Sequence, residues 1–378
     1  MSEIKSLERR LAEYVGRKYC ICTGSGTAAL VVALQSLEFP KKSEVVIPSI
    51  VCPTVAFAVG YSNLKPLFCD VNIRDYQISP KSISNVLSDK TKVIIPVHLF
   101  GQPYNVDAIK KIANMHSLVV IEDAAQSFGG EYNGKKHGSL GDLSIVSFGY
   151  TKIIDATKGL LTGGGGAVFT DDKERYEKIK IIVKKWDQYN AKLAENFYLK
   201  RYNFLFRMCN KSYKSSNGLL NFYKAIPRII RYFKTMFVYH IPVESVRRIL
   251  NQLDSMDEKI KIRMRNANFY KRLLRTKKVI HPKYMCESGV YFRYSALLGH
   301  NCRQKFINEL SKRGVPISTL YFPLHLMYGG KTRLLNSEYV GSHIFNLPVA
   351  PSISEERIEW IASQVNDVAE EQQAEFGR

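Results

Sequence analysis

Short apolar runs alternate with helical patterns between about residues 20 and 170. Helical spacing occurs, for example, over Thr27–Leu37 and Val106–Met115. Near-continuous apolar runs between helices are typical of strands that are buried on both faces of a parallel sheet. We therefore predict a three-layer αβα domain with a mainly parallel sheet. Its expected strands are Glu44–Pro48, Lys65–Asp70, Val93–Val97, Leu118–Glu122, Leu143–Phe148 and Ala167–Thr170.

The pattern changes after residue 170. Residues 171–200 predict a charged helix, and a long helix is expected over about Pro242–Leu274. A strand-like run at Val290–Leu297 and two helical stretches, 303–313 and 353–370, then predict a smaller α+β domain. The sequence thus predicts a large domain over residues 1–241, followed over 242–378 by a linking helix and a small C-terminal domain.

The net charge of +21 is concentrated in one segment. Residues 200–248 contain eleven Lys and Arg side chains and one acid, Glu244. A local excess of this size indicates a local role for the segment.

Other features of the sequence bear on where the protein works. No run of eighteen apolar residues is present, and the N-terminus lacks the basic-then-apolar pattern of a signal peptide. The seven cysteines show no metal-ligand spacing, so no metal site is expected. Together these features predict a cytoplasmic protein.

A helix start in the N-terminal part is a candidate phosphate site. Gly24-Ser25-Gly26-Thr27 precedes the first apolar helix, and Ser25 or Thr27 can cap it. Backbone amides at such a start, together with the helix dipole, favour an anion. A plain turn before a helix has the same sequence pattern.

Two charged residues follow buried strands and complete the parts that pyridoxal phosphate (PLP) needs. Asp123 can keep the cofactor's ring nitrogen protonated, and Gln126 can bond the phenolic oxygen. Lys152, before the glycines at 163–166, can form a Schiff base, and Ser147 can reach the phosphate. Lys158 is a rival for the lysine's role, and the residues alone do not separate the two.

Two histidines are further candidates. His98 follows a predicted strand and is either a site residue or a hydrogen-bonded core side chain. His325 follows Tyr321-Phe322-Pro323 and could line the substrate side of a site.

Several ordered blocks resemble the DegT/DnrJ/EryC1/StrS aminotransferases, which are PLP-dependent sugar aminotransferases of fold type I. The spacing from Gly141-Asp142 through Ser147 to Lys152 is similar to that before the family's Schiff-base lysine, so the resemblance selects Lys152 over Lys158. The other blocks are Ser25–Leu30, Val46–Ser49, Lys65–Val71, Val97–Pro103, Ile121–Gln126, Tyr321–His325 and Leu347-Pro348.

The chain departs from the family pattern at two positions of the expected site. The aromatic ring that stacks on the cofactor in the family falls at Cys52. The family element that reaches into the neighbouring subunit's site is present only as Tyr202–Met208, from which the resemblance implies Asn203 as a cofactor-binding residue.

A further departure is a basic amphipathic insertion over residues 209–240. Its apolar stripe is Leu219, Phe222, Tyr223, Ile226, Ile230, Phe233 and Phe237. One interpretation is a helical cover packed on the dimer, with a solvated basic face, and the other is contact with a membrane surface or a lipid-linked substrate. Nucleic acid is not expected because no recognition motif accompanies the charge.

The resemblance implies an aminotransferase, working as a homodimer, that moves an amino group from glutamate to a keto group of a nucleotide-linked sugar. Surface polysaccharide or related glycan biosynthesis is the implied setting. Two alternatives stay open at this point. One is a sugar dehydratase, although in those relatives a histidine replaces the lysine. The other is a non-catalytic relative that binds a membrane or a polyanion.

Overall fold

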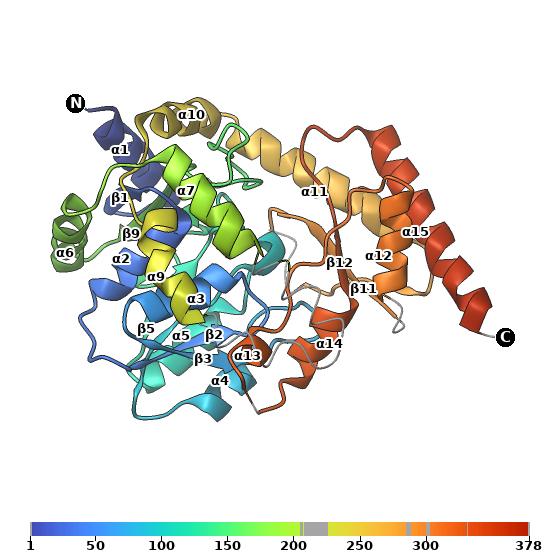
Figure 1. Cartoon of the computed structure of the whole chain (residues 1–378), viewed down its shortest axis with the longest axis horizontal. Helices are drawn as coiled ribbons and strands as arrows, with labels where there is room; N and C mark the ends of the chain where they lie inside the picture. Colours follow the sequence, from blue (N-terminus) through green and yellow to red (C-terminus); the bar gives the residue numbers. More distant parts are fainter. Residues whose placement is uncertain are drawn as a thin grey trace.

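A seven-stranded sheet forms the centre of the larger part of the molecule (Figure 1). The computed structural model describes residues 2–204, 207, 226–284, 289–299, 303–330 and 332–376. The strand order is β1-β9-β8-β5-β4-β2-β3, and only β9 runs against the others. The strands are β1 Tyr19–Thr23, β2 Glu44–Pro48, β3 Lys65–Cys69, β4 Thr91–Ile94, β5 Val119–Asp123, β8 Leu143–Ser147 and β9 Gly166–Thr170.

All six predicted strands are present, and the predicted three-layer fold with a mainly parallel sheet is confirmed. The sequence prediction did not include β1, which lies at the edge of the sheet and pairs with β9 alone. Its run Tyr-Cys-Ile-Cys-Thr is short and contains few strongly apolar side chains, so its pattern is weak.

Helices cover both faces of the sheet because side chains alternate along each buried strand. In β5, Ile121 packs with α2, α3 and α9, whereas Val120 packs with α4 and α5. In β8, Ile145 faces the first group and Val146 faces α1 and α10. These helices are α1 Glu3–Val15, α2 Gly26–Gln35, α3 Pro53–Tyr61, α4 Pro80–Val86, α5 Val106–Met115, α9 Ile226–Phe237 and α10 Val243–Leu253.

A second, antiparallel sheet of three strands lies toward the C-terminus, in the order β10-β11-β12. Its side chains share one core with three helices, α11, α12 and α15, which lie beside it in Figure 1. The elements of this part are β10 Val279–Ile280, β11 Tyr294–Leu298, β12 Ile344–Leu347, α11 Met256–Leu273, α12 Arg303–Lys312, α13 Leu324–Met327, α14 Leu335–His343 and α15 Glu355–Phe376.

The long helix expected over Pro242–Leu274 is instead two helices, α10 and α11, separated at Asp254-Ser255. The break lets each helix direct its apolar side to a different neighbour. Val246 and Ile249 of α10 pack with α1, whereas Ala267 and Tyr270 of α11 pack in the C-terminal core. The boundary between domains at residues 241 and 242 stays a prediction.

The expected charged helix over residues 171–200 is also interrupted. The structure has α6 Lys173–Lys184, α7 Ala191–Phe197 and then η2 Tyr198–Asn203, a short π-helix. The remaining short elements are η1 Leu99–Gly101 and a hairpin of β6 Glu131–Tyr132 with β7 Lys135–Lys136.

The described end of the basic insertion packs on the protein. Ile226 and Phe233 of α9 are buried in the main core, and Ile230 is half-buried, whereas Arg231 and Lys234 are exposed. The helix contacts α3 and α7, where the Tyr61 and Phe233 ring centroids are 5.1 Å apart. Three residues of the expected stripe, Leu219, Phe222 and Tyr223, lie outside the described residues. Residues 226–237 therefore form a helical cover on their own chain, and the packing of the insertion on a dimer stays a prediction.

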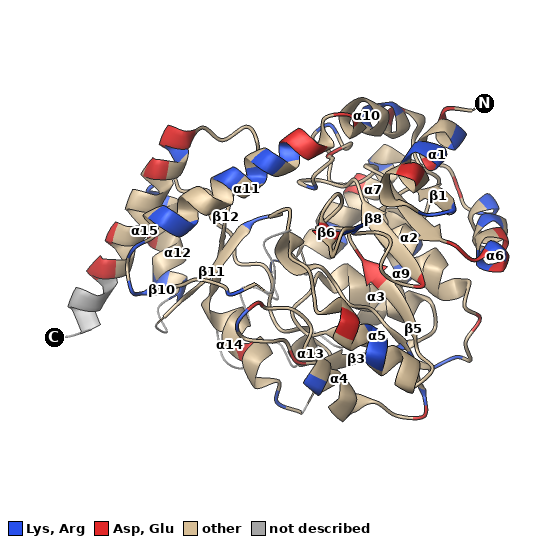
Figure 2. Cartoon of the chain, turned by 180° about the vertical axis from the view of Figure 1, so that it is seen from behind, with Lys and Arg blue, Asp and Glu red and all other residues tan. Residues whose placement is uncertain are grey.

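Charged residues are frequent on outer helices such as α6 and α11, whereas the strands of the large sheet are mostly uncharged (Figure 2). Within the described ranges, no helix combines the length and the apolar character that a membrane span requires.

The packing of α9 predicts that substitutions on its buried and exposed faces affect the free energy of unfolding differently. Phe233→Ala should lower the free energy of unfolding by about 3–5 kcal/mol, since a fully buried ring leaves a cavity. Lys234→Ala should change it little, because this lysine pairs with Asp187 in solvent. Urea unfolding of both variants measures the difference, and equal effects would contradict the packing of α9.

Candidate active site

A cavity of about 420 Å³ opens beside the carboxyl ends of β5 and β8. Ligands of open α/β sheets bind in this position. All eight predicted site residues line it: Ser25, Gly26, Thr27, Asp123, Gln126, Ser147, Lys152 and Asn203. Lys158 does not line the cavity, and its side chain is exposed.

Asp123 is the last residue of β5 and is buried at the cavity wall. Burial raises the pKa of its carboxyl group, although the N–H of Ala125, 2.9 Å from Oδ1, and the charge of Lys152 both oppose this shift. A buried carboxylate that has a single backbone donor can accept a further positive partner.

The amine of Lys152 lies in the cavity without a hydrogen bond or ion pair to any described residue. Its nearest recorded contact is the ring of Phe292, whose centroid is 4.8 Å from Nζ. Burial lowers the pKa of Lys152 and outweighs the opposite effects of Cys52 and Asp123. A lysine in this environment is more readily deprotonated, as a nucleophilic amine must be.

The start of α2 and a glycine turn form another wall of the cavity. Ser25 Oγ accepts a hydrogen bond from Ala28 N (2.9 Å) and donates one to Phe237 O (2.8 Å), so this hydroxyl caps the helix. A Cβ on Gly26 would lie 2.5 Å from that of Ser147, and one on Gly164 would lie 2.3 Å from Phe148 O. The two glycines thus allow the close backbone approach that shapes this wall.

Aromatic rings lie next to Cys52, the position at which the resemblance implies a stacking ring. Tyr202 Oη is 3.6 Å from Cys52 Sγ, and the Tyr202 ring packs on Tyr198 and Phe237 at centroid distances of 5.0 and 5.7 Å. Tyr202 and Asn203 belong to η2, so this short helix brings both residues to the cavity of their own chain.

Gln126 already has partners in the structure. Its Oε1 accepts a hydrogen bond from Phe100 N at 2.9 Å, and its Nε2 donates to Tyr321 Oη at 3.4 Å. The side chain is therefore held in place at the cavity wall, with its amide group directed toward Tyr321.

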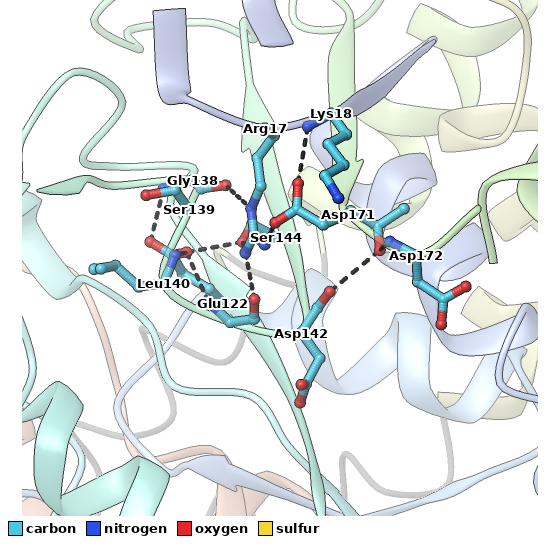
Figure 3. Close-up of polar contacts among 12 residues, drawn as sticks. Arg17, Lys18, Glu122, Gly138, Ser139, Leu140, Asp142, Ser144, Asp171 and Asp172 are labelled. Atoms are coloured by element: carbon cyan, nitrogen blue, oxygen red, sulfur yellow. Dashed lines mark hydrogen bonds and ion pairs between the residues drawn. The ribbon is translucent and has the colours of Figure 1, made fainter. Parts of the chain in front are cut away.

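Glu122, the neighbour of Asp123, does not line the cavity. Its side chain instead contacts the loop before β8 (Figure 3). Its carboxylate accepts hydrogen bonds from Gly138 N (2.7 Å), Leu140 N (2.6 Å) and Ser144 Oγ (2.8 Å). Burial opposes ionisation, but the hydrogen bond and charge of His98, 2.9 Å away, and the backbone donors lower the pKa of Glu122 to about 2. This acid therefore has a structural role.

Neither candidate histidine lines the cavity. His98 is fully buried and bonded to Glu122, so the interpretation as a hydrogen-bonded core side chain applies. His325 Nδ1 lies 2.7 Å from Ser49 Oγ, and burial lowers the pKa of this imidazole. Among the described residues, no group of His, Cys, Asp and Glu side chains could hold a metal ion.

Phe292, Arg293 and Tyr321 also belong to the cavity wall, although the sequence did not indicate them as site residues. Phe292 and Arg293 precede β11, far from the other site residues along the chain. The signal that could have revealed Arg293 is a lone charge within the otherwise uncharged run from Val290 to Leu297.

The residues of the cavity fit PLP. Asp123 ends β5, and Lys152 follows the neighbouring strand β8, with its amine unpartnered among the described residues. The glycine-lined helix start leaves room for a phosphate. Fold and site together define a PLP-dependent aminotransferase.

Comparisons with known proteins identify the family. The sequence pattern of the DegT/DnrJ/EryC1/StrS aminotransferase family matches residues 2–210 and 248–366. The chain belongs to this family, which confirms the resemblance found in the sequence. Residues 211–247 lie between the two matched stretches.

Individual relatives support the assignment. GDP-perosamine synthase of Caulobacter vibrioides is 27% identical over 97% of this chain and 90% of its own length. UDP-2-acetamido-2-deoxy-3-oxo-D-glucuronate aminotransferase of Pseudomonas aeruginosa is 38% identical over 48% of this chain and 49% of its own length. The structure of a putative sugar aminotransferase from Streptococcus pneumoniae, in its PMP form, has a TM-score of 0.80 at 19% identity, covering 100% of this chain and 93% of that one.

The environment of Glu122 predicts a pH-dependent contribution to stability. A carboxyl pKa of about 2 instead of 4.5 corresponds to about 3 kcal/mol of stability. This contribution is complete above pH 4.5 and is lost as the pH falls toward 2. Glu122→Gln should therefore be less stable than the wild type by about 3 kcal/mol at pH 7, and the difference should shrink below pH 4.5.

Urea unfolding between pH 7 and pH 3 measures this difference. Glu13→Gln is the control, because Glu13 is an exposed glutamate paired with Arg9 on the surface of α1. A pH-independent difference for Glu122→Gln would show that the carboxylate does not carry the effect.

Proposed function

We propose that the protein transfers an amino group from glutamate to a keto group of a nucleotide-linked sugar. The observation that carries the proposal is the amine of Lys152, unpartnered among the described residues, in one cavity with the buried Asp123 of the PLP aminotransferase fold. The substrate class is supported by relatives that are named for GDP-, UDP- and dTDP-sugars.

The roles of the chain's residues follow from their environments. Bound PLP supplies an electron sink that stabilises negative charge on the donor carbon. Lys152 would hold the cofactor through Nζ and, once released, would move a proton at the donor carbon as acid and base. Asp123 would keep the ring nitrogen protonated, because its negative charge favours the pyridinium form.

The remaining predicted residues would bind and orient the cofactor. Ser147 and Thr27, with the backbone at Gly26, lie at the glycine-lined wall that suits a phosphate. Gln126 is fixed at the wall by Phe100 and Tyr321 and would orient the ring. Asn203 and the aromatic rings beside Cys52 would enclose the cofactor on another side of the cavity.

The alternatives are less well supported. Sugar dehydratases of the family carry a histidine where this chain has Lys152. A non-catalytic role at a membrane would need a free apolar surface on the insertion, whereas the apolar side of α9 is packed inside the protein.

The proposal extends to the biosynthetic pathway, the oligomeric state and the compartment of the protein. We place the enzyme in surface polysaccharide or related glycan biosynthesis, since relatives include the spore coat polysaccharide protein SpsC of Bacillus subtilis. We also propose a homodimer in the cytoplasm. Tyr150 lines the cavity and is exposed, and the exposed Leu160, Leu199 and Phe204 each adjoin a cavity-lining residue in the sequence. These apolar side chains would suit a subunit interface. Membrane contact through 209–240 is a separate expectation, which bears mainly on residues outside the described ranges.

The lysine assignment predicts a spectroscopic difference. Wild-type protein with added PLP should show a visible absorbance band that L-glutamate bleaches, whereas Lys152→Ala should lack the band. Lys158→Ala is the matched control and should behave as the wild type, because its side chain is exposed outside the cavity. Loss of the band in the Lys158 variant alone would overturn the assignment.

If Asp123 is the partner of the ring nitrogen, its loss should slow the reaction with glutamate but should not prevent the binding of PLP. Asp123→Asn should retain the visible band with PLP, but glutamate should bleach it at least ~100-fold more slowly, because the ring nitrogen loses its negative partner. Stopped-flow absorbance measures the rate. A wild-type rate in this variant would remove Asp123 from the mechanism.

A further inference from the structure

The loop after β8, residues 148–157, carries Lys152 and returns to its own starting point. Ala156 N donates a hydrogen bond to Phe148 O at 3.0 Å, which closes the base of the loop. Ile154, two residues after the lysine, is buried in one core with side chains of α10. The backbone of the loop is thus fixed on the protein, while Lys152 lines the cavity.

Asp155 closes this loop from within, although it does not itself line the cavity. Its Oδ2 accepts a hydrogen bond from Thr151 N at 2.8 Å. Its Oδ1 accepts two more, from Thr157 N at 2.9 Å and from Thr157 Oγ1 at 2.6 Å. One carboxylate therefore joins the residue just before Lys152 to the residue that follows the closed base of the loop.

The backbone conformation of Thr151 gives the first of these bonds particular weight. Its φ of +65° lies in the left-handed region, which a β-branched residue rarely adopts. The turn at Thr151 also sets the direction in which the next residue, Lys152, leaves the loop. The hydrogen bond from Thr151 N to Asp155 therefore stabilises the conformation from which the lysine reaches the cavity.

Two side chains of α10 hold the returning part of the same loop. Gln252 Nε2 donates to Asp155 O, and Arg248 Nη1 donates to Ala156 O, each at 3.0 Å. The carboxylate of Asp155 thus binds within the loop, while its carbonyl is bound from α10. Asp155 is the residue at which both sets of contacts meet.

The amine of Lys152 has no comparable fixation of its own. No hydrogen bond or ion pair holds Nζ among the described residues, and the centroid of the Phe292 ring lies 4.8 Å from it. The place of the amine is therefore set mainly by the backbone that carries it. In the proposed reaction this amine is bonded to the cofactor and then released. Proton transfer then requires it to stay within reach of the donor carbon.

We propose that Asp155 is a positioning residue for Lys152: by joining the loop before and after the lysine, it keeps the released amine at the place where it reacts. The inference rests on the proposed function, because it concerns how the same lysine is held. Asp155 is assigned no contact with cofactor or substrate and no proton-transfer step.

The test compares Asp155→Asn with a matched control. The side-chain amide of the variant cannot accept both sets of hydrogen bonds, because one oxygen is replaced by a donor. Asp70→Asn is the control, since Asp70 is also half-buried and accepts bonds from Val71 N, Ser337 N and Ser337 Oγ, but does not line the cavity. Thr157→Val is a milder second variant, which removes only the hydroxyl donor to Asp155.

Two measurements separate the placing of the lysine from damage to the cavity as a whole. Stopped-flow absorbance gives the rate at which the visible band forms at saturating PLP, a step that requires Nζ of Lys152. Isothermal titration calorimetry gives the affinity for pyridoxamine phosphate, the aminated cofactor, which has no aldehyde for the lysine to attack.

We expect Asp155→Asn to slow band formation at least ~10-fold, because a misplaced amine lowers the rate of a step between groups held together. Its affinity for pyridoxamine phosphate should equal that of the wild type. Thr157→Val should slow band formation to a smaller extent, and Asp70→Asn should match the wild type in both measurements. In the PLP-free protein, hydrogen exchange of the peptide that spans residues 148–157 should be faster in Asp155→Asn than in the wild type or Asp70→Asn.

A wild-type rate of band formation in Asp155→Asn would overturn the inference. An equal loss of pyridoxamine phosphate affinity would also overturn it, because Asp155 would then support the whole cavity. Equal slowing in Asp70→Asn would do the same, since it would indicate general destabilisation. If Asp155→Asn does not fold, a wild-type rate in Thr157→Val counts against the inference.

The wild-type protein separates this inference from the proposed function. Absence of the visible band in the wild type refutes the proposed function. A normal band in the wild type, with an unchanged rate in Asp155→Asn, refutes only the role of Asp155.

Discussion

The alternation of side chains along β5 is the constraint on which the site depends. Because successive residues of a strand point to opposite faces, Glu122 and Asp123 cannot share one environment. Glu122 turns into a shell of donors that fixes the loop before β8, and Asp123 turns to the cavity. Since β8 leads to Lys152, the structural acid holds in place the strand from which the lysine follows.

Burial acts on the two reactive groups in opposite directions. It raises the pKa of Asp123 and lowers that of Lys152, so each is pushed toward its neutral form. Neither group is neutralised by a close ion pair within the described residues, and each can therefore interact with a ligand. A cofactor with an aldehyde and a basic ring nitrogen meets both requirements at once.

The segment between the two family-matched stretches contributes to the site from within the chain. Ser25 Oγ donates to Phe237 O, Gly24 N donates to Tyr239 O, and Gly163 N donates to Tyr239 Oη. The end of α9 thus connects the helix start to the glycine turn. The end of the basic insertion therefore supports the cavity wall through hydrogen bonds.

The sequence by itself determined the alternating strands and helices, the family, and the residues at strand ends, because periodicity and motif spacing are local properties. Only the tertiary structure divided α10 from α11, brought Tyr202 beside Cys52, and brought Arg293 into the same cavity as Lys152. These outcomes depend on which side chains lose water and which distant segments meet. Burial and long-range contact arise from the packing of the whole chain, so no local pattern specifies them.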